Sequence, residues 1–157
     1  MPRSARITIQ KACYHIITRG NQKQTVFKEP TDFQKYLLLL SRYKQKHNFK
    51  LYCFCLMPNH VHMIIEVDKP EALNKIMRGL NLSYTLYFNL KYQKVGHLWQ
   101  DRFKSKIIEK DAYLLECINY IETNPIRASL ASNLSEYPWN SWNFKEDPKM
   151  LDNLYAF

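Results

Sequence analysis

The order of strand-like and helix-like segments constrains the fold more than any other feature of this sequence. Residues 12–19 are rich in β-forming side chains and end at Gly20-Asn21, which predicts a strand followed by a turn. Residues 50–56 and 60–67 read as two further strands. Met57-Pro58-Asn59 separates them, because proline lacks the backbone donor that a continuous strand needs.

Two helices are expected between these strands and after them. Thr31 and Gln34 have the spacing of a capping box, which predicts a helix of about 16 residues that ends near Lys46. Apolar side chains recur at helical spacing over residues 71–92 and predict a longer second helix. Beyond Gly96 we expect residues 98–108 to be extended.

A last helix is predicted from Ala112 to about Thr123, with Asp111 as its cap and Pro125 beyond its end. The tail from about residue 131 is expected to be irregular. The resulting order, β-α-β-β-α-β and then a helix, predicts an α+β fold of the ferredoxin-like, split βαβ type. Its antiparallel sheet would carry helices on one face, with the C-terminal helix added, and residues 1–157 would form one domain.

The charge of the chain indicates the class of partner. Lysine and arginine number 23 against 14 acidic residues, a net charge of +9, which attracts polyanions. Nucleic acid is the first candidate and an anionic membrane surface the second, while a basic protein without such a partner remains an alternative. No apolar run approaches the ~20 residues of a membrane span, and residues 1–6 lack the apolar core of a secretory signal. We therefore expect a cytoplasmic protein with no membrane partner.

The cysteines are expected to be reduced, because no secretory signal is present. A zinc site formed by Cys53, Cys55, His60 and His62 is conceivable from the residue types, although C-x-C-x4-H-x-H is not a common zinc pattern. The chain has four cysteines: Cys13, Cys53, Cys55 and Cys117.

His60-Val61-His62 is the most distinctive local pattern. Residues i and i+2 of a strand point to the same face, so the two imidazoles would project side by side and could hold one divalent cation. The alternative is a pair of polar strand residues without a ligand.

Tyr120 and Asn124 are four residues apart, which places them on one helical face about 6 Å from each other. The amide oxygen of Asn124 could complete a His-His-Asn site for Mg²⁺ or Mn²⁺ that is open to a phosphate. The Tyr120 phenol could then attack phosphorus, given a metal-polarised phosphate. Each residue also has a structural alternative, as a half-buried aromatic and as the end of a helix.

Other residues near these motifs leave alternatives open. Tyr113 lies two turns before Tyr120 on the same helix, but no suitable ligand follows it at the fourth position. His15 and His97 suggest structural or DNA-contacting roles. Glu66 shares the strand face of the histidines and could orient them, act as a ligand, or be an exposed acid at the strand end, which we favour.

Several segments together resemble the REP-associated tyrosine transposases, a branch of the single-tyrosine HUH transposases (His, hydrophobic residue, His). They occur in the family's order and span Tyr14 to Trp142, nearly the whole chain. The matching segments are Met57-Pro58-Asn59-His60-Val61-His62, Tyr14 to Asn21, Val95 to Lys104, Tyr120 to Ala128, and Tyr137-Pro138-Trp139-Asn140-Ser141-Trp142.

This resemblance implies a metal-dependent endonuclease and strand transferase that acts on single-stranded DNA. His60 and His62 match the metal ligands, and Tyr120 matches the nucleophile that becomes linked to the 5′-phosphate. Asn124 occupies the position of a third ligand that is often glutamine in the wider family. The implied cofactor is Mg²⁺ or Mn²⁺. The implied substrate is a DNA hairpin with a short flanking guide sequence, bound by a monomer or by a homodimer with exchanged helices.

DNA contacts are harder to place from sequence. Trp99 and Phe103 could stack on unpaired bases or belong to the core. A non-catalytic nucleic-acid-binding protein on a ferredoxin-like sheet remains the alternative function, and a relaxase or replication initiator is disfavoured by the short chain. The candidate phosphate partners include Arg19, Arg102, Lys104 and Arg127, with Arg3, Arg6, Lys23, Arg78 and Lys106 as further candidates.

Overall fold

The fold is built on a four-stranded antiparallel sheet. A computed structural model describes residues 11–153; Arg3 and Arg6 lie outside these described residues. The strands stand in the order β2-β3-β1-β4, and each neighbouring pair is antiparallel. Their bounds are β1 Ala12–Arg19, β2 Lys50–Met57, β3 His60–Val67 and β4 Lys104–Ile108.

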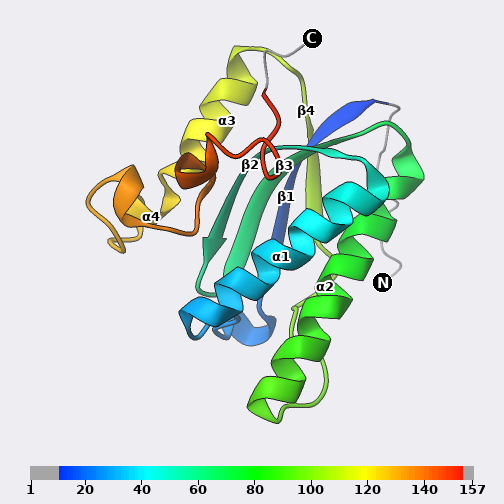
Figure 1. The fold of residues 1–157 in the computed structure, drawn as a ribbon, viewed down its shortest axis with the longest axis vertical. Helices are drawn as coiled ribbons and strands as arrows, with labels where there is room; N and C mark the ends of the chain where they lie inside the picture. The colour runs from blue at the N-terminus through cyan, green and yellow to red at the C-terminus, as the bar shows by residue number, and fades with distance from the viewer. Residues whose placement is uncertain (1–10, 154–157) are drawn as a thin grey trace.

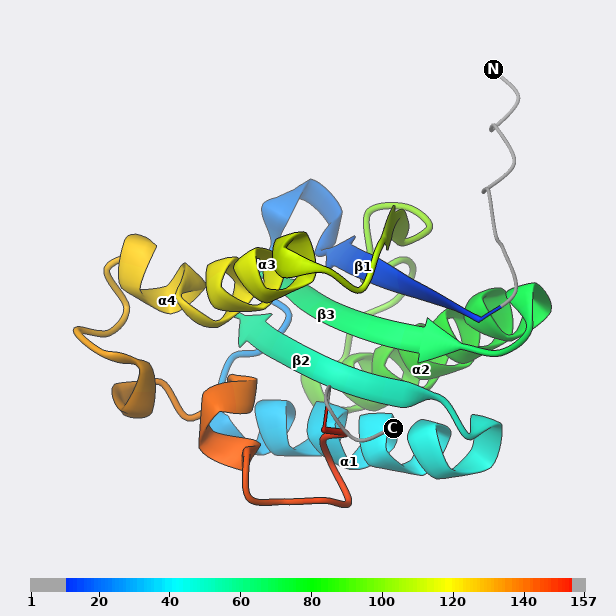
Figure 2. The ribbon, with the colours of Figure 1, turned by 90° about the horizontal axis from the view of Figure 1, so that it is seen from above.

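Helices cover both faces of this sheet (Figures 1 and 2). The helices α1 (Pro30–His47) and α2 (Pro70–Tyr92) lie side by side on one face, and α3 (Ala112–Glu122) lies on the other. The predicted α+β, ferredoxin-like architecture is therefore confirmed, with the last helix opposite the first two. The short helices are η1 Asn21–Lys23, α4 Asn124–Arg127, η2 Leu134–Glu136 and η3 Ser141–Phe144.

Strand alternation sorts the side chains of β3 between two apolar layers. Val61, Met63 and Ile65 belong to the core beneath α1 and α2. Ile64 belongs to a second, smaller core under α3. His62 has the same parity as Ile64, so the sequence places it on the α3 face.

Two local predictions were wrong. The capping box of α1 is formed by Glu29 and Asp32, two residues before the predicted pair, and Pro30 takes the first helical position, which suits proline. Of the segment 98–108, only Lys104–Ile108 forms a strand. Trp99 forms only a single isolated bridge, to Gly20. Its indole is buried in the α1–α2 core, where Nε1 donates to the Asn81 carbonyl (3.3 Å).

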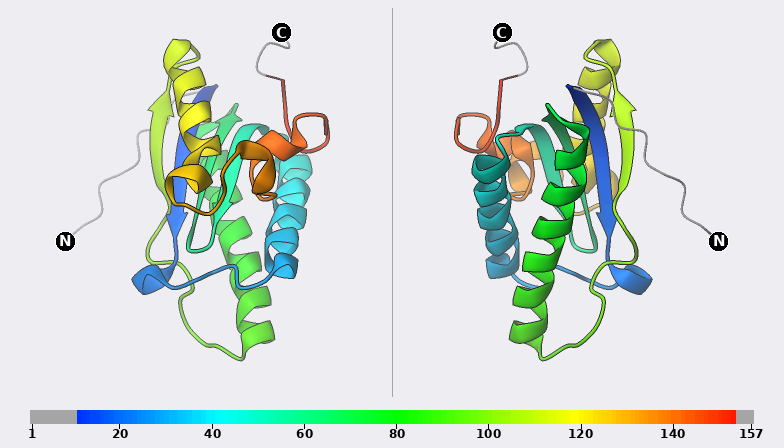
Figure 3. Two further views of the ribbon diagram at one scale, coloured as in Figure 1. Left: turned by 90° about the vertical axis from the view of Figure 1, so that its left-hand side faces the viewer. Right: turned by 90° about the vertical axis from the view of Figure 1, so that its right-hand side faces the viewer.

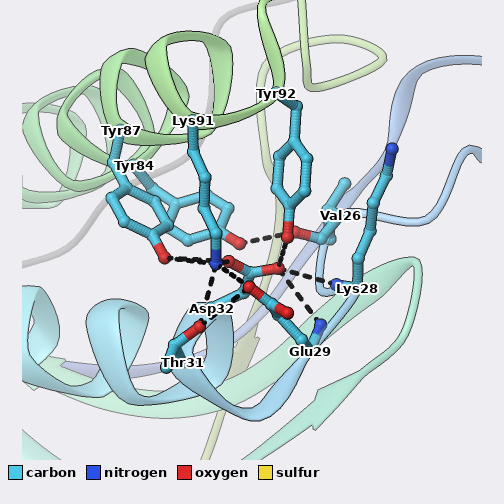
Figure 4. A network of polar contacts seen from close by, with 9 residues as sticks. All are labelled: Val26, Lys28, Glu29, Thr31, Asp32, Tyr84, Tyr87, Lys91 and Tyr92. Atoms are coloured by element: carbon cyan, nitrogen blue, oxygen red, sulfur yellow. Dashed lines mark hydrogen bonds and ion pairs between the residues drawn. The ribbon is translucent and has the colours of Figure 1, made fainter.

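The Asp32 carboxylate joins the beginning of α1 to the end of α2 (Figure 4). Its Oδ1 accepts from Lys91 Nζ and the Tyr87 hydroxyl, both at 2.8 Å, and its Oδ2 accepts from the Tyr92 hydroxyl at 2.5 Å. Backbone N–H groups of Lys28 and Glu29 add two further donors. Burial alone would raise the pKa of this carboxyl, but the hydrogen bonds outweigh it and lower the pKa to about 2.

Replacing Asp32 by asparagine is expected to lower the free energy of unfolding by ~2–4 kcal/mol, because a donor amide would face buried donors. The depressed pKa means that this stability is present above the unfolded-state pKa of about 4, and it is lost as the pH falls towards 2. Urea unfolding at pH 7 and pH 3 measures both effects. The exposed Glu71→Gln is the control, expected to change stability by under ~0.5 kcal/mol; equal losses in both variants would contradict the assignment.

The tail from α4 to residue 153 contains no strand, and it packs along β2 (Figure 3). The Leu56 N–H donates to the Trp139 carbonyl (2.8 Å), and Cys55 forms an antiparallel bridge with Asn140. The Trp139 indole stacks on the Phe33 ring of α1, with centroids 4.7 Å apart. The expected irregular tail therefore belongs to the body of the molecule.

Candidate functional site

The two histidines of the H-x-H pattern lie side by side where β3 begins. His60 is opposite Arg19 of β1 and Met57 of β2, and His62 is the next residue on the same face. Their ring centroids are 4.9 Å apart, with the ring planes 80° apart. His60 is half-buried, whereas His62 is only 4% exposed. The predicted projection of both imidazoles from one strand face is thus found.

Each imidazole uses its Nδ1 atom for a contact within the protein. His60 Nδ1 lies 2.6 Å from Asn59 Oδ1, and His62 Nδ1 lies 3.1 Å from His15 Nε2. An amide oxygen only accepts, so this contact favours a proton on His60 Nδ1 and leaves a lone pair on its Nε2. In both imidazoles, therefore, Nδ1 contacts a neighbouring side chain, and Nε2 is the ring nitrogen that is left for a metal ion.

Both histidines are held in the neutral form that metal binding requires. Burial and the nearby Arg19 charge together lower the pKa of His60 to about 4, burial being the larger cause. Burial lowers the pKa of His62 to about 3, with contributions from His60, His15, Arg19 and Arg127. Among the described residues, no three His, Cys, Asp or Glu side chains gather to form a metal group, so a third protein ligand would have to be of another type.

The helix α3 brings Tyr120 to the same end of the molecule. Figure 2 shows the C-terminal end of α3, and α4 after it, over the end of the sheet where β2 stops and β3 starts. Tyr120 is 54% exposed. The Arg127 guanidinium lies over its ring, 4.0 Å from the centroid, and also acts on the pKa of His62. Arg127 therefore links the electrostatic surroundings of the tyrosine and of the histidine pair.

The break between α3 and α4 gives Arg127 this position. Pro125 stands in the first turn of α4, where its missing N–H costs no helical bond. The short helix then directs Arg127 back along α3, where its guanidinium donates to Thr123 Oγ1 and to the Tyr120 carbonyl, both at 2.5 Å. This contact was not foreseen, although the i, i+4 and i, i+7 spacings of Thr123, Tyr120 and Arg127 were visible.

The tail fixes the end of α3 through a buried carboxylate. Glu122 is 4% exposed, and its Oε2 accepts from Ser141 Oγ at 2.7 Å. The Asn140 side-chain amide donates to the Glu122 carbonyl at 3.2 Å. Lys145 Nζ lies 3.8 Å from Glu122 Oε1. The segment that resembled a family signature therefore anchors the helix two residues after Tyr120.

The predicted third metal ligand, Asn124, and the predicted DNA-contacting residues lie in different parts of the structure. Asn124 is half-buried at the first position of α4, so its role as a ligand stays a prediction. Arg19 and Lys104 are exposed on β1 and β4, on the face that α3 covers mainly over β2 and β3. Arg102 instead lines a cavity of about 770 Å³ between α2 and the segment 96–103. The structure thus groups Arg19 and Arg127 with the histidines and places Arg102 beside α2.

Glu66 is not an exposed acid, and this expectation was wrong. It is 5% exposed and accepts from the Tyr52 hydroxyl (2.9 Å) and from Cys13 Sγ (3.4 Å). It also forms an ion pair with Lys110. Lys110 lies in the turn before α3, and no local sequence pattern predicts that this turn reaches Glu66 on β3.

The aromatic and cysteine alternatives are also resolved among the described residues. Trp99 and Phe103 are buried in the α1–α2 core, so they are not exposed stacking platforms. The cysteines are free thiols, as expected. Cys53, Cys55, His60 and His62 do not gather into a cluster that could hold zinc in the described part of the chain. No helix in the described part of the chain is both long and apolar enough to cross a membrane.

The chain is similar in sequence to a known family and to an individual relative. The sequence profile of the family described as "Transposase IS200 like" matches residues 8–124. A Haemophilus influenzae (strain Rd KW20) protein assigned as a REP-associated tyrosine transposase is 26% identical over 117 residues. That match covers 66% of this chain and 66% of the relative, just under two thirds of its length.

Solved structures share the fold. The structure of a REP-associated tyrosine transposase bound to a REP hairpin superposes with a TM-score of 0.73 at 16% identity, over 100% of this chain and 95% of that one. A Deinococcus radiodurans protein assigned as a transposase gives a TM-score of 0.53 at 15% identity, over 78% of this chain and 97% of that one. At these identities the likeness concerns the fold.

Proposed function

The chain belongs to the family of IS200-like transposases, and on this premise we propose that it is a metal-dependent DNA endonuclease and strand transferase. The observation that carries the proposal is the pair of neutral, adjacent imidazoles of His60 and His62. They lie at the end of the sheet beside which α3, the helix that contains Tyr120, ends. The proposed intermediate is a covalent 5′-phosphotyrosine on Tyr120.

The donor set fits a divalent metal ion. Contacts to Asn59 and His15 occupy the Nδ1 atoms of His60 and His62, so both imidazoles would bind through Nε2, with the Asn124 amide oxygen as the proposed third ligand. Mg²⁺ and Mn²⁺ accept such a mixed set and leave positions for phosphate oxygens and water. When bound, the ion would polarise a non-bridging oxygen of the scissile phosphate and orient it for in-line attack.

Tyr120 is the nucleophile in this proposal. Its phenolic oxygen attacks the phosphorus, and the bond from phosphorus to the 3′-oxygen of the preceding nucleotide breaks. The phenolic proton leaves to solvent, the departing 3′-oxygen takes up a proton, and the 5′-phosphate stays on Tyr120. A DNA 3′-hydroxyl reverses these steps in the second reaction. The number of phosphodiester linkages is conserved, so no energy-rich cofactor is needed.

Arg127 and the exposed cations of the sheet would hold the DNA strand. Arg127 lies over the Tyr120 ring and can offset the negative charge that gathers beside it during attack. Arg19 and Lys104 lie on the part of the sheet face that α3 leaves open, where they can contact backbone phosphates. We propose single-stranded DNA with a hairpin and a short guide sequence as substrate, in keeping with the REP hairpin bound by a relative of the same fold.

An adduct assay tests the function. The protein is incubated with a hairpin oligonucleotide labelled at its 3′ end, with Mn²⁺ or with EDTA. We expect a denaturation-resistant adduct that carries the label only when Mn²⁺ is present, because the fragment 3′ of the cut keeps its 5′-phosphate on Tyr120. Binding of the hairpin with no cleavage and no adduct would favour the alternative, a non-catalytic nucleic-acid-binding protein.

A further inference from the structure

We infer that His15 is a positioning residue that holds His62 in the ring orientation and tautomer needed to bind a metal ion. The inference rests on the proposed function, because it takes His62 as a ligand. It assigns a role to a histidine for which the sequence offered only structural or DNA-contacting alternatives.

The sheet register brings His15 and His62 together. β1 and β3 are antiparallel, with His15 opposite Ile64 and Ile17 opposite His62, so His15 lies diagonally across from His62 on the same face. The ring centroids are 5.3 Å apart and the ring planes are tilted by 31°. His15 Nε2 lies 3.1 Å from His62 Nδ1, which is hydrogen-bond distance.

A hydrogen bond between two neutral imidazoles needs one N–H and one lone pair, which leaves two arrangements. If His62 Nδ1 donates to His15 Nε2, then His62 Nε2 keeps its lone pair and can bind metal. If His15 Nε2 donates instead, the proton of His62 is on Nε2 and blocks it. Metal binding therefore requires His15 to act as the acceptor.

The burial of His62 makes its contact with His15 important. His62 is 4% exposed, so bulk water has little access to replace His15 as the acceptor. His60 shows the same device in simpler form, because Asn59 Oδ1 can only accept from its Nδ1. The two ligands thus each have a fixed acceptor behind them, one from the turn before β3 and one from β1.

Mn²⁺ binding by the whole protein, measured by electron paramagnetic resonance, tests the inference without relying on cleavage. His15→Phe keeps a ring but removes the acceptor, and it is expected to weaken Mn²⁺ binding ~10–100-fold. His15→Gln retains an acceptor oxygen and is expected to recover most of that affinity. His97→Phe alters an exposed histidine outside the pair and should bind Mn²⁺ as the unaltered protein does.

The outcomes separate the inference from the function on which it rests. Full Mn²⁺ affinity in a folded His15→Phe protein, with binding lost in His62→Ala, would overturn the role of His15 alone. Unchanged affinity in His62→Ala would overturn the metal site itself. Nitrogen-15 NMR of the unaltered, metal-free protein needs no variant to fold. We expect the His62 proton on Nδ1, and a proton on Nε2 would overturn the inference.

Discussion

Tyr120→Phe is expected to abolish both strand cleavage and the covalent adduct, lowering the cleavage rate by ~10⁴-fold or more. The change removes only the phenolic oxygen, which is the proposed nucleophile. The ring that Arg127 covers remains, and Tyr120 is 54% exposed, so the fold and the cation contact should persist. DNA affinity should change by less than about twofold, because an uncharged hydroxyl adds little to a contact dominated by phosphates. Single-turnover cleavage and gel-shift titration measure the two effects.

Tyr113→Phe is the matched control for this experiment. Tyr113 lies seven residues earlier on α3, is 45% exposed and accepts a hydrogen bond from Lys106 Nζ at 3.3 Å. Its replacement should leave the adduct intact. If Tyr120→Phe still cut DNA and Tyr113→Phe did not, the nucleophile would be Tyr113. If both variants cut, tyrosine would not be the nucleophile.

His60→Ala is expected to have the second largest effect, a loss of metal-stimulated cleavage by ~10²-fold or more. Replacing a residue that only hydrogen-bonds to a metal ligand lowers metal affinity or activity by ~10–100-fold, and replacing a ligand itself should lower it by at least as much. His60 is half-buried and contacts Asn59 in the adjoining turn, so its truncation should cost little stability. Cleavage measured against Mn²⁺ concentration, together with thermal unfolding, distinguishes lost metal from lost fold.

His97→Ala serves as the control, since His97 is exposed in the segment between α2 and β4. It should retain the Mn²⁺ dependence of the unaltered protein. Cleavage by His60→Ala that responds to Mn²⁺ as before would show that the ion binds elsewhere.

Alternation and turn residues were sufficient to predict three of the four strands. β1, β2 and β3 begin at the expected residues, because a two-residue period and the Pro58 interruption are local properties. The beginning of α1 was misplaced because Thr31 and Gln34 have the spacing of a capping box, whereas Glu29 and Asp32 form it. Asp32 is held at this position by hydrogen bonds from α2, including those from Tyr87 and Lys91, which are more than 50 residues away in sequence. A local spacing rule does not contain such partners.

In the candidate site, too, features that depend on one strand were predicted and features that depend on distant segments were not. The shared direction of His60 and His62 follows from one strand and was predicted. The contact of His62 with His15 depends on the register between β1 and β3, which no local pattern specifies. For Glu66, strand parity predicted the correct face of the sheet. Its burial was not predicted, because the ion pair with Lys110 depends on the position of a distant turn.

The tail has a consequence for how these molecules behave at high concentration. β2 is one edge of the sheet, and an edge strand with free backbone groups can pair with another chain and aggregate. Here Leu51 and Leu56 direct backbone groups to Asp152 and Trp139 of the same chain. The opposite edge, β4, carries the exposed lysines Lys104 and Lys106, whose charges repel a second copy. One edge is thus covered and the other charged, which favours a protein that stays dispersed at high concentration.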